Sequence, residues 1–241
     1  MLGLAPGHTL HREQVMEELW PESDPASADN NLHQTLHLAR RALDEAVEGA
    51  GSRLTLTGDL VSLAGDLWVD VLAFEADAAS ARSGDRRARQ AALARLTGEL
   101  LPEDRYEAWA TARRDAIDAT WLELTLAEAQ AHHTDAEPEA AIALLHRIVE
   151  ADPLHEEAHR LLMRIHAEAG NRATALQQYA TLETALRNEL GVAPAADTRA
   201  LRERIATNEL SPPPAPERPP RTNLPSIATP LIGREREIGE V

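Results

Sequence analysis

Two stretches of the chain, 34 residues apart, share one pattern of apolar residues. The first is Ala141-Ile142-Ala143-Leu144-Leu145-His146-Arg147-Ile148-Val149, and the second begins Ala175-Leu176-Gln177-Gln178-Tyr179-Ala180-Thr181-Leu182. The offset aligns Ala141 with Ala175, Leu145 with Tyr179 and Ile148 with Leu182. Apolar residues three and four positions apart predict the buried stripe of an amphipathic helix. The two stretches therefore predict the same helix of a repeating unit.

The repeat length identifies the kind of unit. A helix–turn–helix that recurs every 34 residues is the tetratricopeptide pattern, in which stacked helix pairs bury a continuous core. Asp152-Pro153 ends one helix and begins the next, because proline suits a first helical turn. Gly170-Asn171 and Gly191 end the helices that follow. The alternative is an irregular helical bundle in which the offset arises by chance.

The helical pattern covers residues 72–209, which are dominated by Ala, Leu, Glu and Arg. Beyond it, residues 211–220 are mostly prolines that lack amide donors, and they predict an extended, polyproline-like linker. We therefore predict a helical domain over residues 71–209, a proline-rich linker over 210–225 and the beginning of another domain over 226–241.

Residues 1–70 follow a different pattern. A short helix, which His11 and Gln14 are placed to cap, has an apolar face made of Val15, Met16, Leu19 and Trp20. A longer helix from about Ser27 to Ala46 carries a buried stripe of Leu32, Leu36, Ala39 and Leu43. Apolar residues then alternate on either side of Gly58-Asp59, which predicts a β-hairpin. Helix, turn, helix and hairpin is the order of a winged helix-turn-helix, so the predicted fold class is mainly α.

These stretches resemble two domains of one kind of bacterial regulator. Residues 11–21 resemble the second helix of an OmpR-like winged helix, and residues 30–43 resemble its recognition helix, which commonly ends in Arg-Arg-x-Leu. Residues 67–75 are similar to the junction of that winged helix with a bacterial transcriptional activator domain. Further matches to that domain are residues 101–109, 152–159 and 188–194. The resemblance covers residues 8–209 and implies a transcription regulator of the antibiotic-regulatory-protein type.

Both ends of the sequence bear on this resemblance. Residues 224–237 resemble the start of a signalling NTPase domain, but the chain has no phosphate-binding loop and no Lys to supply its cation. We therefore expect no bound nucleotide or other cofactor. Residues 1–6 have room only for the end of the first helix of a winged helix. We accordingly expect a truncated winged helix over residues 1–70, with part of its sheet missing.

Composition sets further limits on the class of protein. The chain lacks Cys, which excludes disulfides and Cys-based metal sites. It also lacks an apolar run long enough to span a membrane, so a cytoplasmic protein is expected. The net charge is -16, and residues 1–70 hold 4 Arg against 12 acidic residues. Because nucleic-acid-binding proteins usually present a basic face, this charge argues against strong DNA binding by the chain alone.

The longer helix of residues 27–46 nevertheless presents a polar side that suits DNA. Asn and Gln can pair with adenine and Arg with guanine, and a helix fits the major groove. An ordinary solvated helix face is the alternative. Leu38 occupies a position where the resembled family often has a basic residue. The predicted DNA-contacting residues are Asn30, His33, Gln34, His37 and Arg41 on this helix and Arg53 before the hairpin.

A second motif suggests a different chemistry. His155-Glu156-Glu157-Ala158-His159 matches His-Glu-x-x-His, in which two His one helical turn apart bind zinc and Glu activates water. His166 is a conceivable third ligand, but it lies seven residues further along the same helix, where it cannot close a tetrahedral site. The resembled domain has similar residues here at packing positions. We therefore expect no metal and no enzyme, and zinc peptidase activity is the least favoured reading.

The other polar groups predict no chemistry. His132-His133 is expected to be a solvated helix end, and Arg86-Arg87 and Arg113-Arg114 are expected on solvated faces or in ion pairs. We predict a DNA-binding transcriptional activator that reads promoter DNA. Its helical repeats would mediate self-association or contact RNA polymerase. The alternative is a protein-interaction scaffold with tetratricopeptide-like repeats that does not bind DNA.

Overall fold

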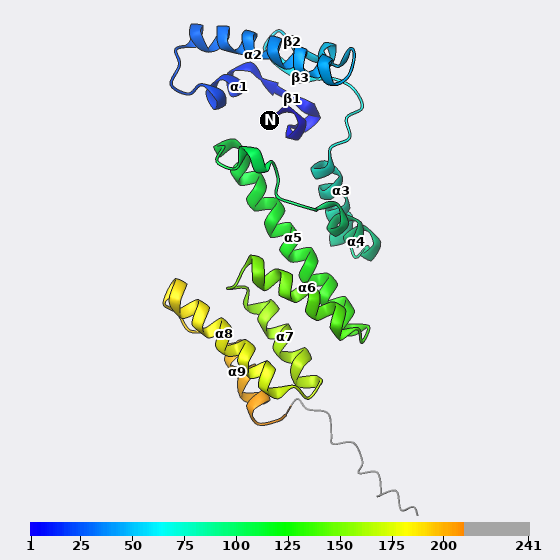
Figure 1. Cartoon of the computed structure of the whole chain (residues 1–241), viewed down its shortest axis with the longest axis vertical. Coiled ribbons are helices and arrows are strands. Elements are labelled where there is room, and N and C mark those ends of the chain that lie inside the picture. The colour runs from blue at the N-terminus through cyan, green and yellow to red at the C-terminus, as the bar shows by residue number, and fades with distance from the viewer. Residues whose placement is uncertain (210–241) are drawn as a thin grey trace, which may run out of the picture.

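The protein is elongated, with a small helix-and-sheet unit at one end and a stack of helices that runs away from it. Figure 1 shows this arrangement in a computed structural model, which describes residues 1–209. The predicted linker and NTPase start lie outside the described residues. The fold class is mainly α, as predicted: a unit with the helix, helix and hairpin order of a winged helix-turn-helix is followed by tetratricopeptide-like repeats. No helix within residues 1–209 is long and apolar enough to span a bilayer.

The N-terminal unit holds two α-helices and a three-stranded sheet. Its helices are α1 (Arg12–Leu19) and α2 (Pro25–Ala46), and its strands are β1 (Thr9–His11), β2 (Leu54–Thr57) and β3 (Leu60–Leu63). Three short 3₁₀ helices complete it: η1 (Leu2–Leu4), η2 (Pro6–His8) and η3 (Ala50–Arg53). The antiparallel sheet has the order β1-β3-β2, with Val61 opposite both Leu10 and Leu56. The predicted hairpin is confirmed, and Gly58, at φ +59, opens its two-residue turn.

Local sequence signals set the bounds of both helices. The His11 side chain accepts from the backbone N–H of Glu13 at 3.3 Å, and Gln14 Oε1 accepts from the backbone N–H of His11 at 3.1 Å, which confirms the predicted cap. Asp24 caps α2 by accepting from the backbone N–H groups of its first turn, which also contains Pro25. The helices and sheet share a core of Val15, Leu32, Leu36, Leu54 and Val61.

Strand β1 corrects the sequence prediction for the first residues. We expected residues 1–6 to hold the end of an α-helix, whereas they form 3₁₀ turns that lead into β1. Strand β1 pairs with β3, and the Thr9 hydroxyl donates to Ser62 Oγ at 3.0 Å. Three residues are too few to show an alternating pattern, which explains why the sequence did not reveal this strand.

The middle of the molecule is formed by α3 (Asp70–Arg82), α4 (Arg86–Arg95), η4 (Pro102–Asp104) and the long α5 (Ala108–Thr134). Phe74 and Ala78 of α3, Ala92 of α4 and Ile117 of α5 are buried together in one cluster. Leu4 of the N-terminal unit packs against the same cluster. The N-terminal unit and the middle of the molecule therefore share apolar contacts, in addition to the connecting segment between β3 and α3.

The helices α6 (Pro138–Ala151), α7 (Glu156–Glu168), α8 (Arg172–Leu190) and α9 (Ala196–Ala206) complete the stack. Helices α6 and α8 begin 34 residues apart. All six residues that the offset aligns are buried: Ala141, Leu145, Ile148, Ala175, Tyr179 and Leu182. Gly191 ends α8 in the left-handed conformation, at φ 69. The repeat prediction is confirmed, and the irregular bundle is not what the chain forms.

Candidate nucleic-acid interface

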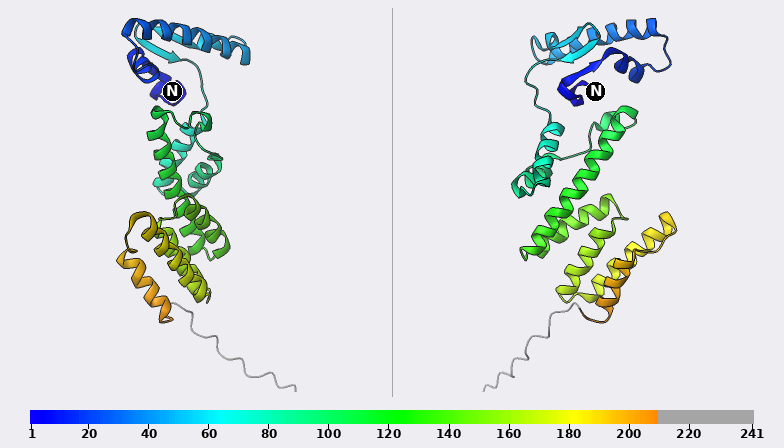
Figure 2. Two further views of the ribbon diagram at one scale, coloured as in Figure 1. Left: turned by 60° about the vertical axis from the view of Figure 1, so that its left-hand side comes forward. Right: turned by 180° about the vertical axis from the view of Figure 1, so that it is seen from behind.

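Helix α2 presents its polar side outward. Its N-terminal half is anchored by Leu32 and Leu36, which are 1% and 6% exposed. The predicted DNA-contacting residues of this helix are all exposed: Asn30, His33, Gln34, His37 and Arg41. Figures 1 and 2 show α2 at the end of the molecule opposite to helices α6–α9. The helical repeats therefore do not cover the face that a duplex would approach.

The polar side of α2 is only partly engaged within the protein. Asp29 pairs with Arg12 of α1, and His33 Nε2 lies 3.9 Å from the same carboxylate. Arg41 lies 3.7 Å from Glu45 one turn along the helix. Within residues 1–209, the side chains of Asn30, Gln34 and His37 make no hydrogen bond or ion pair. Their donors and acceptors are free to pair with base edges.

The same side contains an apolar residue that the sequence did not select as a contact. Leu38 is 62% exposed, and with His33, Gln34 and His37 it lines a shallow hollow of about 400 Å³. An exposed leucine in such a place can pack against the methyl group of thymine. Its signal in the sequence is a large apolar residue that falls outside the buried stripe.

The structure separates Arg53 from the other predicted contacts. Arg53 ends η3 at the base of the hairpin, where its guanidinium lies against Gly65. The far end of the hairpin is formed by Gly58 and Asp59 and carries no basic residue. Arg40, which the sequence did not single out, points inward, and its Nε donates to the carbonyl of Leu54 at 2.8 Å. The hairpin therefore offers little positive charge to a phosphate backbone.

The His-Glu-x-x-His motif has a structural role in this fold. His155 caps α7 and accepts from the backbone N–H of Ala158 at 3.2 Å. Glu156 accepts from the Thr198 hydroxyl at 2.5 Å and thereby fastens the start of α9. His159 is 2% exposed, and its ring nitrogens lie 3.1 Å from the carbonyl oxygen of Pro153 and 2.8 Å from the Gln178 amide nitrogen.

Burial lowers the pKa of His159, so the ring stays neutral and keeps these two partners. Burial also lowers the pKa of His166. Nowhere in residues 1–209 do three or more His, Asp or Glu side chains gather in an arrangement that suits a metal ion. The three side chains of the motif point to three different structural partners, and they do not form a zinc site.

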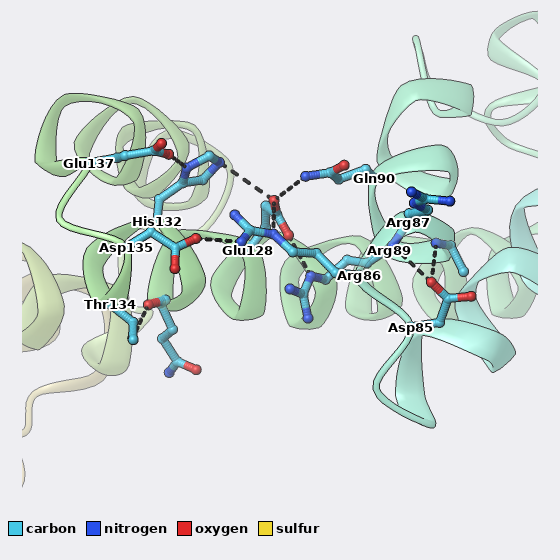
Figure 3. Close-up of polar contacts among 12 residues, drawn as sticks. Asp85, Arg86, Arg87, Arg89, Gln90, Glu128, His132, Thr134, Asp135 and Glu137 are labelled. Atoms are coloured by element: carbon cyan, nitrogen blue, oxygen red, sulfur yellow. Dashed lines mark hydrogen bonds and ion pairs between the residues drawn. The ribbon is translucent and has the colours of Figure 1, made fainter.

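A buried carboxylate organises the junction of α4 and α5. Figure 3 shows Glu128, which is 3% exposed, accepting from Arg89 Nε at 2.6 Å, Gln90 Nε2 at 2.8 Å and Arg86 Nε at 3.2 Å. Burial would raise the pKa of Glu128, but these hydrogen bonds outweigh it and hold the pKa below its ordinary value. The prediction of ion pairs for Arg86 is confirmed.

The same cluster corrects the prediction for His132. Rather than a solvated helix end, His132 lies between two carboxylates, with Nε2 3.5 Å from Glu128 and Nδ1 2.5 Å from Glu137. Glu137 immediately precedes α6, and Figure 3 shows it beside His132. Glu128 and His132 thus connect α4 through α5 to the first helix of the repeat.

Arg113 and Arg114 also differ from each other in a way that the sequence did not show. Arg113 pairs with Glu75 of α3 at 2.6 Å, as an ion pair of the kind predicted. Arg114 is 8% exposed, which excludes the solvated face, and its Nε lies 3.9 Å from Glu99, which agrees with the predicted alternative of an ion pair. It donates to the backbone carbonyls of Leu100, Asp104 and Arg105 at 3.0, 2.6 and 3.0 Å.

A winged helix-turn-helix with an exposed polar helix, joined to tetratricopeptide-like repeats, is typical of transcription regulators. Residues 69–206 match the family described as "Bacterial transcriptional activator domain", and the chain belongs to this family. The family consists of transcription factors rather than enzymes. No curated protein matches the chain.

Among solved structures, the chain is similar to "Mycobacterium tuberculosis EmbR in complex with low affinity phosphopeptide". The TM-score is 0.65 at 22% identity, and the match covers 86% of this chain. The chain spans 57% of the length of that protein. The similarity shows that the two proteins share a fold.

Proposed function

We propose that this protein is a transcriptional activator that reads promoter DNA with α2. The observation that carries the proposal is the exposed polar face of α2 at the outer end of the molecule, on which Asn30, Gln34 and His37 have no partner within residues 1–209. Asn30 and Gln34 would pair with adenine, Arg41 with guanine or phosphate, and Leu38 would pack on thymine. His33 and His37 lie between these groups on the same exposed side.

The domain assignment forms part of the proposal. Residues 1–70 would be the DNA-binding domain, related to the OmpR-like winged helix, and residues 71–209 the activator domain. Residues 210–225 would link them to the start of an NTPase domain at residues 226–241. A protein that reads promoter DNA works where the chromosome lies, which in bacteria is the cytoplasm.

The helical repeats would contact other proteins, either RNA polymerase or a second copy of the chain. Self-association would compensate for the acidic charge of the DNA-binding unit, since residues 1–70 carry 4 Arg against 12 acidic residues. Such a unit would bind DNA weakly by itself, since affinity for DNA comes mainly from phosphate neutralisation. Two or more copies on adjacent sites would multiply that weak affinity.

The test is selection of binding sites from a pool of random duplexes by the full chain, followed by a gel-shift titration of the enriched sequence at two salt concentrations. We expect one enriched motif and binding that weakens as salt rises. If no motif is enriched and nothing binds at low salt, the DNA-binding role is wrong. The scaffold without DNA binding would then be the better description of the protein.

A further inference from the structure

A polar groove lies between the C-terminal end of α5 and one face of α7. Its volume is about 340 Å³, and its walls include Gln130, His133, Glu157, Arg160, Leu161 and Arg164. Leu161 is only 8% exposed. The groove is distant in sequence from the polar face of α2 and has no part in the proposed reading of DNA.

Two contacts between the helices occupy Glu157, which lines the groove, and Glu168, which lies further along α7. Gln130 Nε2 of α5 donates to Glu157 Oε1 of α7 at 3.1 Å. His133 Nε2 of α5 lies 3.4 Å from Glu168 Oε2 near the end of α7. The carboxylates that could have neutralised the arginines of α7 are therefore engaged across the groove.

The two arginines are left without an acidic partner. Arg160 and Arg164 lie one turn apart on α7, and no carboxylate of residues 1–209 lies within 4.0 Å of either guanidinium. Arg160 contacts only the Thr198 hydroxyl, at 3.4 Å, and Arg164 makes no polar contact in the described chain. Like charges one helical turn apart repel each other. What distinguishes these two arginines is that they lie side by side along the wall of one groove.

We propose that the groove between α5 and α7 binds a carboxylate side chain from an acidic segment of a partner protein. A carboxylate would accept charge-assisted, bidentate hydrogen bonds from the guanidinium groups and relieve their repulsion. Leu161 would contact an apolar neighbour of that side chain. The inference rests on the proposed role of the repeats in protein contacts, and not on DNA binding by α2.

The groove suits a peptide carboxylate better than a DNA backbone. Duplex DNA presents a long row of phosphates, which require a broad basic surface. Here only two arginines line the groove, and Glu157 lies beside them. Two guanidinium groups match the size and charge of one carboxylate better than a row of phosphates.

The experiment uses the full chain and a fluorescent peptide of alternating Asp and Leu, with binding measured by anisotropy. The double variant Arg160→Gln/Arg164→Gln should bind this peptide at least about tenfold more weakly than the unchanged chain. Arg204→Gln is the matched control, because Arg204 is an exposed arginine of α9 whose side chain has no partner in the described chain. This control should bind as the unchanged chain does.

Other readouts can overturn the inference. It is wrong if a peptide with Asn in place of Asp binds equally well, or if Arg204→Gln weakens binding as much as the double variant does. Displacement of the peptide by inorganic phosphate at micromolar concentration would also contradict it. Arg164→Gln alone removes no hydrogen bond or ion pair within residues 1–209, so it should fold normally and still weaken binding if the double variant folds poorly. Both variants should keep the wild-type affinity for the selected duplex, which separates failure of this site from failure of DNA binding.

Discussion

Glu128 of α5 and Arg89 of α4 form an ion pair of 2.6 Å, in which the Glu128 side chain is 4% exposed and the Arg89 side chain 14% exposed. The two residues are 39 positions apart in the sequence. The same carboxylate also accepts from Arg86 and Gln90 (Figure 3). One buried acid thus holds α4 against α5, and His132 extends the contact to the residue before α6.

Replacing Glu128 should destabilise the activator domain strongly. In Glu128→Gln, two arginines lose their common charge partner at a buried position, and breaking such a pair costs about 3 kcal/mol. Urea unfolding of the full chain, followed by circular dichroism, measures the loss. Glu123→Gln is the matched control, since Glu123 pairs with Arg82 on the surface and its side chain is 53% exposed. The control should lose less than about 1 kcal/mol; equal losses would contradict a special role for the buried pair.

Substitutions on α2 should change the selectivity for DNA. Asn30→Ala and Gln34→Ala each remove an amide that would read a base, at an expected cost of about 1–3 kcal/mol for the selected duplex. Binding to random duplexes should hardly change, because these side chains carry no charge. Thr35→Ala, an exposed position of the same helix away from the predicted face, provides the control. Gel-shift titrations that show equal effects for Thr35→Ala and Gln34→Ala would refute the assigned face.

Acidification should weaken the fold through His159. Burial lowers its pKa, whereas in the unfolded chain the ring titrates near its ordinary value of about 6.5. Below that pH the unfolded state takes up the proton first. The contribution of neutral His159 to the free energy of unfolding is therefore complete above about pH 6.5, and it declines as the pH falls toward the lowered pKa.

The free energy of unfolding should therefore decrease from pH 7.5 to 5.5, by at most about 1.4 kcal/mol per pH unit from this group. His159→Gln should show a shallower decline, although it starts from a lower stability. His37→Gln changes an exposed histidine of α2, whose side chain makes no hydrogen bond or ion pair in the described chain, and serves as the control. Parallel pH profiles for all three proteins would show that His159 does not contribute.

Arg114 should determine the order of the loop before α5. Its guanidinium donates to three backbone carbonyls, and Arg114→Gln would leave at least two of them without a donor, at a cost of about 2–4 kcal/mol. Hydrogen exchange of residues 99–107 should become faster. Arg105→Gln removes an exposed side chain that pairs with Glu99 and leaves its own carbonyl in place, so the loop should stay protected. Unchanged exchange in Arg114→Gln would argue against this role.

The helices of this protein could be predicted because their signals are local. The stripes of α2, α6 and α8, the cap formed by His11 and Gln14, and the turn at Gly58 each depend on residues a few positions apart. The exposure of Asn30, Gln34 and Arg41 followed from the same helical geometry, because the side opposite to a buried stripe faces solvent.

Only the tertiary structure decided which polar groups meet. The sequence could not tell Arg114 from Arg113, although one is buried on three carbonyls and the other pairs with Glu75. It also left His159 as a candidate zinc ligand, whereas the two ring nitrogens of His159 are engaged by the carbonyl of Pro153 and the side-chain amide of Gln178. Periodicity states which face of a helix is buried, because it depends on spacing along one helix. The partner of a buried charge depends on how helices far apart in the sequence pack together, and no spacing encodes that.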